Sequence, residues 1–134
     1  MIVVAAVLAA LAALVHVYIF VLETMRWEEP ATRRIFGTTA ETAIVTRSLA
    51  ANQGVYNLLL AIVALAGVVL VLVADPTSGE RAAGDALLTA GLGSMLVAAL
   101  YLIATDRSKA RAAAIQGAFP LFGLLALLVA TLTA

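Results

Sequence analysis

The sequence has little charge and no cysteine. Of its 134 residues only 12% are charged, eight basic and eight acidic, whereas 64% are hydrophobic. Because soluble domains are about a quarter charged, this composition argues against a soluble enzyme or binding module. The net charge of zero argues against a nucleic-acid-binding protein, which needs a basic face to neutralise phosphates. Without cysteine there is no disulfide, no thiolate metal site and no cysteine nucleophile.

The charges are grouped, and they leave four long stretches free of charge: residues 1–22, 48–74, 86–105 and 112–134. At a rise of about 1.5 Å per residue, each is long enough to cross a hydrocarbon core of about 30 Å. A soluble bundle would need a polar stripe on every helix, and residues 2–15 contain no polar side chain. We therefore predict an all-α fold, a transmembrane four-helix bundle that forms one integral membrane domain over residues 1–134. Its helices are expected at about 2–27, 39–73, 83–105 and 111–133.

The basic residues predict the orientation. Seven of the eight lie in the connections after the first and third helices, and only Arg81 follows the second. The positive-inside rule places the first and third connections in the cytoplasm and both termini on the extracytoplasmic side. No Lys or Arg precedes Arg26, so the first stretch lacks the basic start of a signal peptide and is expected to remain as a helix.

The connection between the first two helices carries its own signals. Pro30 after two glutamates should end the first helix. Thr38, followed three residues later by Glu41, has the spacing of a capping box that opens the second. Arg33 and Arg34 are expected to meet lipid phosphates, or alternatively to hold an anionic ligand.

Polar residues within the predicted helices lie at the same depth in the membrane. Such residues are expensive in hydrocarbon, so they usually face the bundle interior and often mark function. Here they fall in the cytoplasmic half of every helix, and the outer half has almost none. We predict a polar pocket among the four helices, open to the cytoplasm or the inner leaflet, that is lined by His16, Tyr18, Glu23, Asn52, Gln53, Tyr56, Asn57, Tyr101, Thr105 and Gln116.

His16 and Glu23 are predicted as the catalytic pair. Seven residues apart, they share a helix face, and a carboxylate near an imidazole is suited to moving a proton or to binding a cationic or hydroxyl-bearing ligand. The other eight residues would orient the ligand. One His and one Glu are too few for a stable metal site, so no metal is predicted, and no cofactor can be identified. The competing interpretation is structural: Asn, Gln and Tyr often only join membrane helices, at about 1 kcal/mol each.

Two motifs carry a family resemblance. The first is His16-Val17-Tyr18-Ile19 with Glu23 and Trp27, and the second is Asn52-Gln53-Gly54-Val55-Tyr56-Asn57. With Tyr101, Thr105, Gln116-Gly117 and Pro120, these resemble the bacterial membrane-protein family called domain of unknown function 1304, over nearly the whole chain. Members usually have Phe just after the second motif, where this chain has Leu58 and Leu59. The resemblance implies a small four-helix protein of the bacterial cytoplasmic membrane and no established activity.

Three functions remain open, and whether the protein is an enzyme stays undecided. It could bind, and chemically process, a small or lipid-like molecule at the inner leaflet. It could be a small proton-coupled transporter that uses Glu23, although the apolar outer half offers no route across. It could be a structural or partner-binding subunit, in which Gly84, Gly91 and Gly93 support close helix contacts, including those of a homo-oligomer. Membrane lipids are expected partners, and nucleic acid is not.

Overall fold

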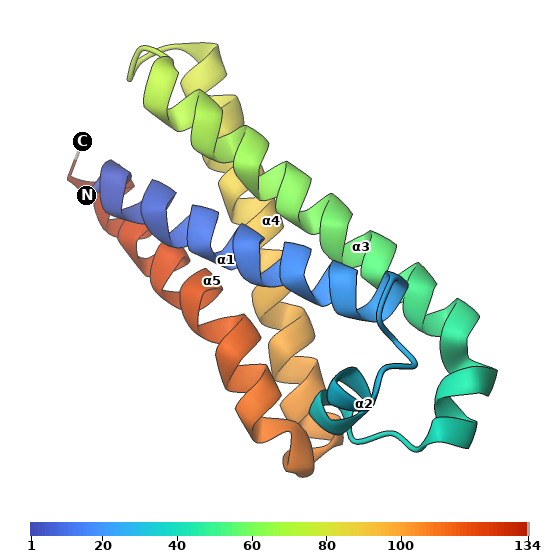
Figure 1. Cartoon of the computed structure of the whole chain (residues 1–134). Coiled ribbons are helices and arrows are strands. Elements are labelled where there is room, and N and C mark those ends of the chain that lie inside the picture. Colours follow the sequence, from blue (N-terminus) through green and yellow to red (C-terminus); the bar gives the residue numbers. More distant parts are fainter. Residues whose placement is uncertain (134) are drawn as a thin grey trace.

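The computed structural model describes residues 1–133 and is helical along almost all of them (Figure 1). Within that range it has no strand. Four segments are long and apolar enough to cross a membrane, which confirms the all-α prediction with four apolar helices. The elements are α1 (Ile2–Thr24), α2 (Pro30–Phe36), α3 (Ala40–Val73), α4 (Gly79–Thr105), the short 3-10 helix η1 (Arg107–Lys109) and α5 (Ala110–Leu132).

The four long helices form a ring in the order α1, α3, α4, α5. Helix α1 packs against α3 and α5, and α4 packs against the same two neighbours. In Figure 1, α1 runs between α3 and α5, with α4 behind it. The start of α1 and the end of α5 meet at one end of the molecule, and α2 lies at the other. We call the end that holds α2, η1 and the starts of α3 and α5 the basic end.

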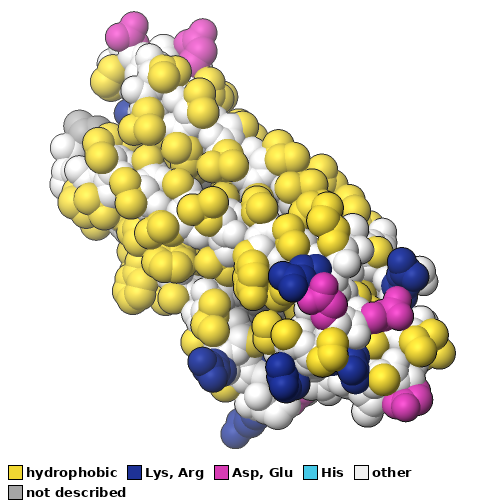
Figure 2. Space-filling model, in the orientation of Figure 1, with side chains coloured by type: hydrophobic (Ala, Val, Ile, Leu, Met, Phe, Trp, Pro, Cys, Tyr) yellow, Lys and Arg dark blue, Asp and Glu magenta, His cyan; other side chains and the backbone are white. Residues whose placement is uncertain are grey.

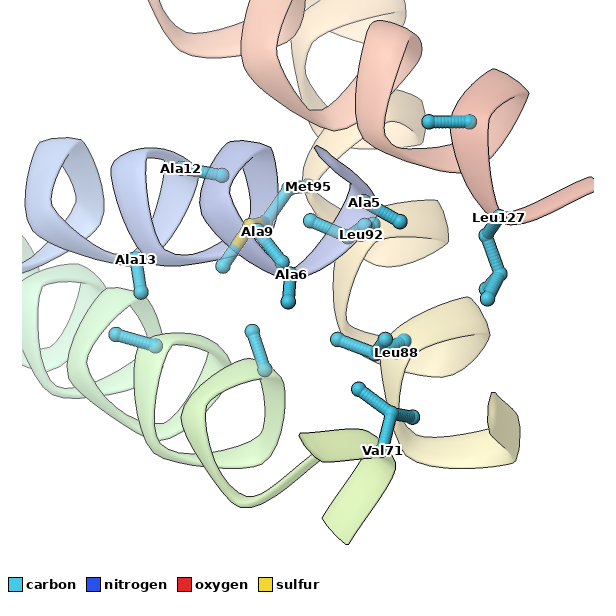
Figure 3. Close-up of a cluster of buried hydrophobic side chains, with 13 residues drawn as sticks. Ala5, Ala6, Ala9, Ala12, Ala13, Val71, Leu88, Leu92, Met95 and Leu127 are labelled. Atoms are coloured by element: carbon cyan, nitrogen blue, oxygen red, sulfur yellow. The ribbon is translucent and has the colours of Figure 1, made fainter. Parts of the chain in front are cut away.

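Small residues let the helices approach closely in the core. Buried alanines of α1 face the core. Ala6 and Ala9 lie beside Leu92 and Met95 of α4, and Ala13 points toward α3 (Figure 3). Glycines do the same between α3 and α4: a Cβ on Gly91 would lie 3.2 Å from the backbone nitrogen of Ala64. Gly84 also packs inside the bundle, whereas Gly93 faces open space. Two of the three glycines considered for partner contacts therefore serve internal packing.

The helix ends differ from the predicted ones at three places. Helix α1 ends at Thr24, three residues early, and the chain then turns so that the Trp27 indole donates hydrogen bonds to the Ala43 carbonyl (3.1 Å) and the Thr46 hydroxyl (3.2 Å). Helix α4 begins four residues early, because the Ser78 hydroxyl accepts from the Arg81 amide at 3.1 Å. The first connection contains α2, which the sequence-based prediction did not include.

The start of α3 is capped by Thr39, not by Thr38 as predicted. The Thr39 hydroxyl accepts a hydrogen bond from the Thr42 amide at 3.2 Å. Thr38 instead belongs to the end of α2, where its amide donates to the Arg33 carbonyl at 3.0 Å. The N-cap of α3 is therefore Thr39, one residue later in the chain than the predicted Thr38.

Replacing Thr39 with alanine should lower the free energy of unfolding by about 1 kcal/mol, because an orphan amide at the start of α3 loses its acceptor. The matched control is Thr38→Ala, whose hydroxyl has no hydrogen-bond partner among the described residues. Thermal unfolding in detergent, followed by circular dichroism, compares the two. Equal losses of stability would contradict the assignment of Thr39 as the cap.

Candidate functional site

A buried carboxylate joins α1 to α3 near the basic end. Glu23, the next-to-last residue of α1, is only 7% exposed. Its Oε2 accepts a hydrogen bond from Asn57 Nδ2 of α3 at 2.9 Å. The same amide also donates to the Gln53 carbonyl one turn earlier, at 3.1 Å. No described Lys, Arg or His forms an ion pair with Glu23. The pair of predicted site residues that the structure brings into contact is therefore Glu23 with Asn57.

Two residues that the sequence analysis left out of the site complete its wall. Gly54 of α3 faces α1 so closely that a Cβ there would overlap the Thr24 hydroxyl and lie 3.2 Å from Glu23 Cβ. Thr24 Oγ1 itself is buried and has no hydrogen-bond partner among residues 1–133. A buried hydroxyl without a described partner thus lies at the contact between Gly54 and α1. The signal in the sequence was a glycine inside the polar motif of residues 52–57, which marks the side of α3 that touches another helix.

His16 is buried but does not contact Glu23. Its side chain is 1% exposed, and its Nδ1 donates to the Ala12 carbonyl of its own helix at 2.9 Å. Seven residues of helix separate the two along α1 by about 10 Å. The imidazole is therefore held against its own backbone, and the predicted catalytic pair does not form a hydrogen bond. Within the described chain, no group of three His, Asp or Glu side chains is arranged to hold a metal ion.

Six of the ten predicted residues lie on the outer surface instead of in the bundle interior: Tyr18, Asn52, Gln53, Tyr56, Tyr101 and Thr105. The exposed fractions of the tyrosines are 55% for Tyr18, 60% for Tyr56 and 71% for Tyr101. Thr105 satisfies its hydroxyl on its own helix, by donating to the Tyr101 carbonyl at 2.9 Å. Gln116, the remaining residue, is half-buried on α5. The structure places these six side chains outside the space among the four helices, where the predicted pocket, open to the cytoplasm or the inner leaflet, was expected.

The outward positions follow from helical geometry. Tyr18 comes two residues after buried His16, Tyr56 two after buried Gly54, and Tyr101 two after buried Ala99. Two residues correspond to a rotation of about 200°, so a side chain two positions from a buried one points away from the bundle. Tyrosines on such faces near a helix end are typical of the aromatic belt at a membrane surface.

Two grooves on the described surface lie elsewhere. One of about 650 Å³ runs along α4 past Thr89, Ser94 and Tyr101. A second of about 600 Å³ lies between α4 and α5 and shares Thr89 with the first. Neither includes Glu23 or Asn57. The Glu23 site is thus a polar contact at the seam of α1 and α3.

The connection next to the site is held by aromatic packing and by ion pairs. The rings of Trp27 and Phe36 meet edge to face, 5.0 Å apart. The Arg26 guanidinium contacts Glu29 at 2.7 Å, and the hydrogen bond that it donates lowers the pKa of Glu29 below its ordinary value. Arg47 of α3 lies 3.4 Å from Glu28. These contacts fix the chain that leads from Glu23 to α3.

Comparison with known proteins identifies a family without identifying a function. The family described as "Protein of unknown function (DUF1304)" matches residues 10–128. That range contains every predicted site residue and confirms the resemblance noted from the two motifs. No curated protein and no solved structure matches the chain.

Proposed function

From the premise that this chain belongs to the DUF1304 family, whose function is not established, we propose that it binds a small or lipid-like molecule at Glu23 and Asn57. The observation that carries the proposal is a buried carboxylate with an amide partner and no cation among the described residues. An isolated buried charge is costly, so such a group favours a ligand that supplies a proton, a hydroxyl or a positive charge. Thr24 adds a hydroxyl without a partner on the same wall.

The position of the site favours an amphipathic ligand. Glu23 is the next-to-last residue of a helix of 23 residues, so it lies near the membrane surface and not at the centre of the bilayer. Apolar side chains are exposed on both helices, among them Leu14 of α1 and Val55 of α3. A molecule with a hydroxyl or cationic head could place that head at Glu23 and its apolar part along the helices. The reaction, if there is one, would use Glu23 without direct help from His16.

We propose that the protein lies in the bacterial cytoplasmic membrane with both termini outside. The basic end holds seven of the eight Lys and Arg residues, and the positive-inside rule orients such an end toward the cytoplasm. The Glu23 site would then be reached from the inner leaflet.

Proton-coupled transport is the weaker alternative. A transporter needs a route from Glu23 to the opposite side of the membrane. Beyond His16 the bundle is filled by fully buried residues, including Ala9, Leu88 and Leu92, which leave no polar path in the described chain. Binding at one side agrees better with this packing.

The proposal is tested by native mass spectrometry of the protein purified in mild detergent. The wild type should carry a bound molecule, and Glu23→Gln and Asn57→Ala should each reduce the bound fraction by about tenfold, as expected when a buried hydrogen bond worth about 1.4 kcal/mol is lost. Ser94→Ala, an exposed polar residue on α4, is the matched control and should keep the molecule. A wild type without a ligand, or variants that retain it fully, would refute the proposal.

A further inference from the structure

The basic end differs from the opposite end of the molecule in its charge. It carries seven basic residues against five acidic ones, Glu23 included, whereas Arg81 at the opposite end stands among three acidic residues. Figure 2 shows the Lys and Arg side chains gathered at the end that holds α2, below a largely apolar surface. Arg81 is neutralised by Asp85 at 3.2 Å. An excess of positive charge is therefore confined to one end.

Within this end the arginines differ in their partners. Arg33 is half-buried and donates to the Glu28 carbonyl at 3.1 Å. Arg26 and Arg47 are paired with the glutamates of the first connection. Arg34, Arg107 and Arg111 are exposed, and none of them forms an ion pair with a described residue. Asp106, next to Arg107 in the chain, accepts at Oδ1 from the Ser108 amide at 2.9 Å and from the Ser108 hydroxyl, and it forms no ion pair with a described residue. Arg34, Arg107 and Arg111 are therefore available to an external anion.

A specific contact joins the two segments that carry these three arginines. Lys109 Nζ donates to the Phe36 carbonyl at 2.6 Å, which fastens the end of α2 to the start of α5. Arg34 is two residues before Phe36, and Arg107 and Arg111 are each two residues from Lys109. Gly37 ends α2 beside this contact with a φ of +65°, a backbone conformation that residues with a side chain rarely adopt. The arrangement is therefore set by the backbone and not only by net charge.

Apolar neighbours place this group at a membrane surface. Ile35, next to Arg34, and Ile44 on the first turns of α3 are both exposed. An exposed basic helix face with exposed apolar side chains beside it is typical of a segment that lies in the headgroup region. The anion that matches is a phosphate, since guanidinium groups bind its oxygens in bidentate fashion.

We propose that Arg34, Arg107 and Arg111, on segments joined by the Lys109–Phe36 contact, form a binding site for the phosphate headgroup of an anionic phospholipid. The site is separate from Glu23 and does not depend on the function proposed for it. A bound lipid would fasten α2 and the start of α5 to the membrane surface.

The test measures lipid binding to the full chain in detergent by native mass spectrometry, with phosphatidylglycerol and phosphatidylcholine of the same acyl chains as probes. The wild type should bind phosphatidylglycerol more tightly by about tenfold or more, and the triple variant Arg34→Gln/Arg107→Gln/Arg111→Gln should lose that preference. Arg107→Gln should weaken it, whereas the matched variant Arg81→Gln at the opposite end should not. Circular dichroism verifies that each variant keeps its helices.

Two further measurements distinguish a specific binding site from nonspecific electrostatic attraction. Gly37→Val changes no charge but strains the backbone at the end of α2, where φ is +65°, so it should weaken the preference for phosphatidylglycerol by at least about threefold. Inorganic phosphate at the same concentration should not displace the lipid. Equal binding of both lipids by the wild type, a Gly37→Val variant that matches the wild type, or displacement by inorganic phosphate would each overturn the proposal. Glu23→Gln should leave this binding unchanged, so the failure of either proposal can be recognised separately.

Discussion

Replacing Gly67 with alanine should destabilise the bundle by about 1–3 kcal/mol, as overpacking of a well-packed core usually does. A Cβ at this position in α3 would lie 2.8 Å from the backbone nitrogen of Leu88 and 3.1 Å from the carbonyl oxygen of Gly84, both in α4. Because these are backbone atoms, no side chain can rotate to make room. Relief requires that α3 and α4 move apart along the whole seam.

Gly93→Ala is the matched control for Gly67→Ala. Gly93 lies in the middle of α4, and a Cβ there would meet no atom within 4 Å. Both substitutions remove the same backbone freedom from the unfolded chain, so the difference between them isolates the effect of packing. Thermal unfolding in detergent, followed by circular dichroism, should give a clearly lower midpoint for Gly67→Ala alone. Similar midpoints for the two variants would mean that α3 and α4 are not packed through this glycine.

The membrane spans could be predicted from the sequence because long stretches without a charged residue are easy to recognise. Each long helix contains a stretch that lacks charge, and four such stretches in 134 residues favour membrane-spanning helices. The helix ends were harder to predict. The turns of α4 that precede residue 83 contain Glu80 and Arg81, which look like a loop by charge, yet the Ser78 cap makes them helical. The signals for α2 were present as Pro30 at its start and Gly37 at its end, a pairing typical of short helices.

The site was only partly predictable, because spacing along one helix shows which residues share a face but not where that face points. The motif of residues 52–57 contains two polar faces, one with Asn52 and Tyr56 and one with Gln53 and Asn57. Gly54 decides between them. It is the residue of the motif that lies against α1, and Asn57, nearly one turn later, reaches Glu23. The small residues, more than the polar ones, indicate which side of each helix is buried.

The Glu23–Asn57 contact could serve to stabilise the bundle or to bind a ligand. These two roles predict opposite results for a double substitution. Asn57→Leu should lower the free energy of unfolding by about 1–3 kcal/mol, since it leaves the buried Glu23 carboxylate without its donor. Replacing both partners, as Glu23→Leu/Asn57→Leu, should restore stability to about the wild-type value or above it, because an apolar pair carries no desolvation cost.

Ligand retention should not follow stability in this cycle. The double variant should be as stable as the wild type and still carry no bound molecule, since it has lost both the carboxylate and the amide. Unfolding in detergent gives the stabilities of the wild type, the two single variants and the double variant, and native mass spectrometry gives the bound fraction of each. If the double variant is less stable than both single variants, the pair exists to hold α1 against α3. Recovery of stability without recovery of the ligand would mean that the protein keeps a costly buried carboxylate for binding, which apolar packing cannot supply.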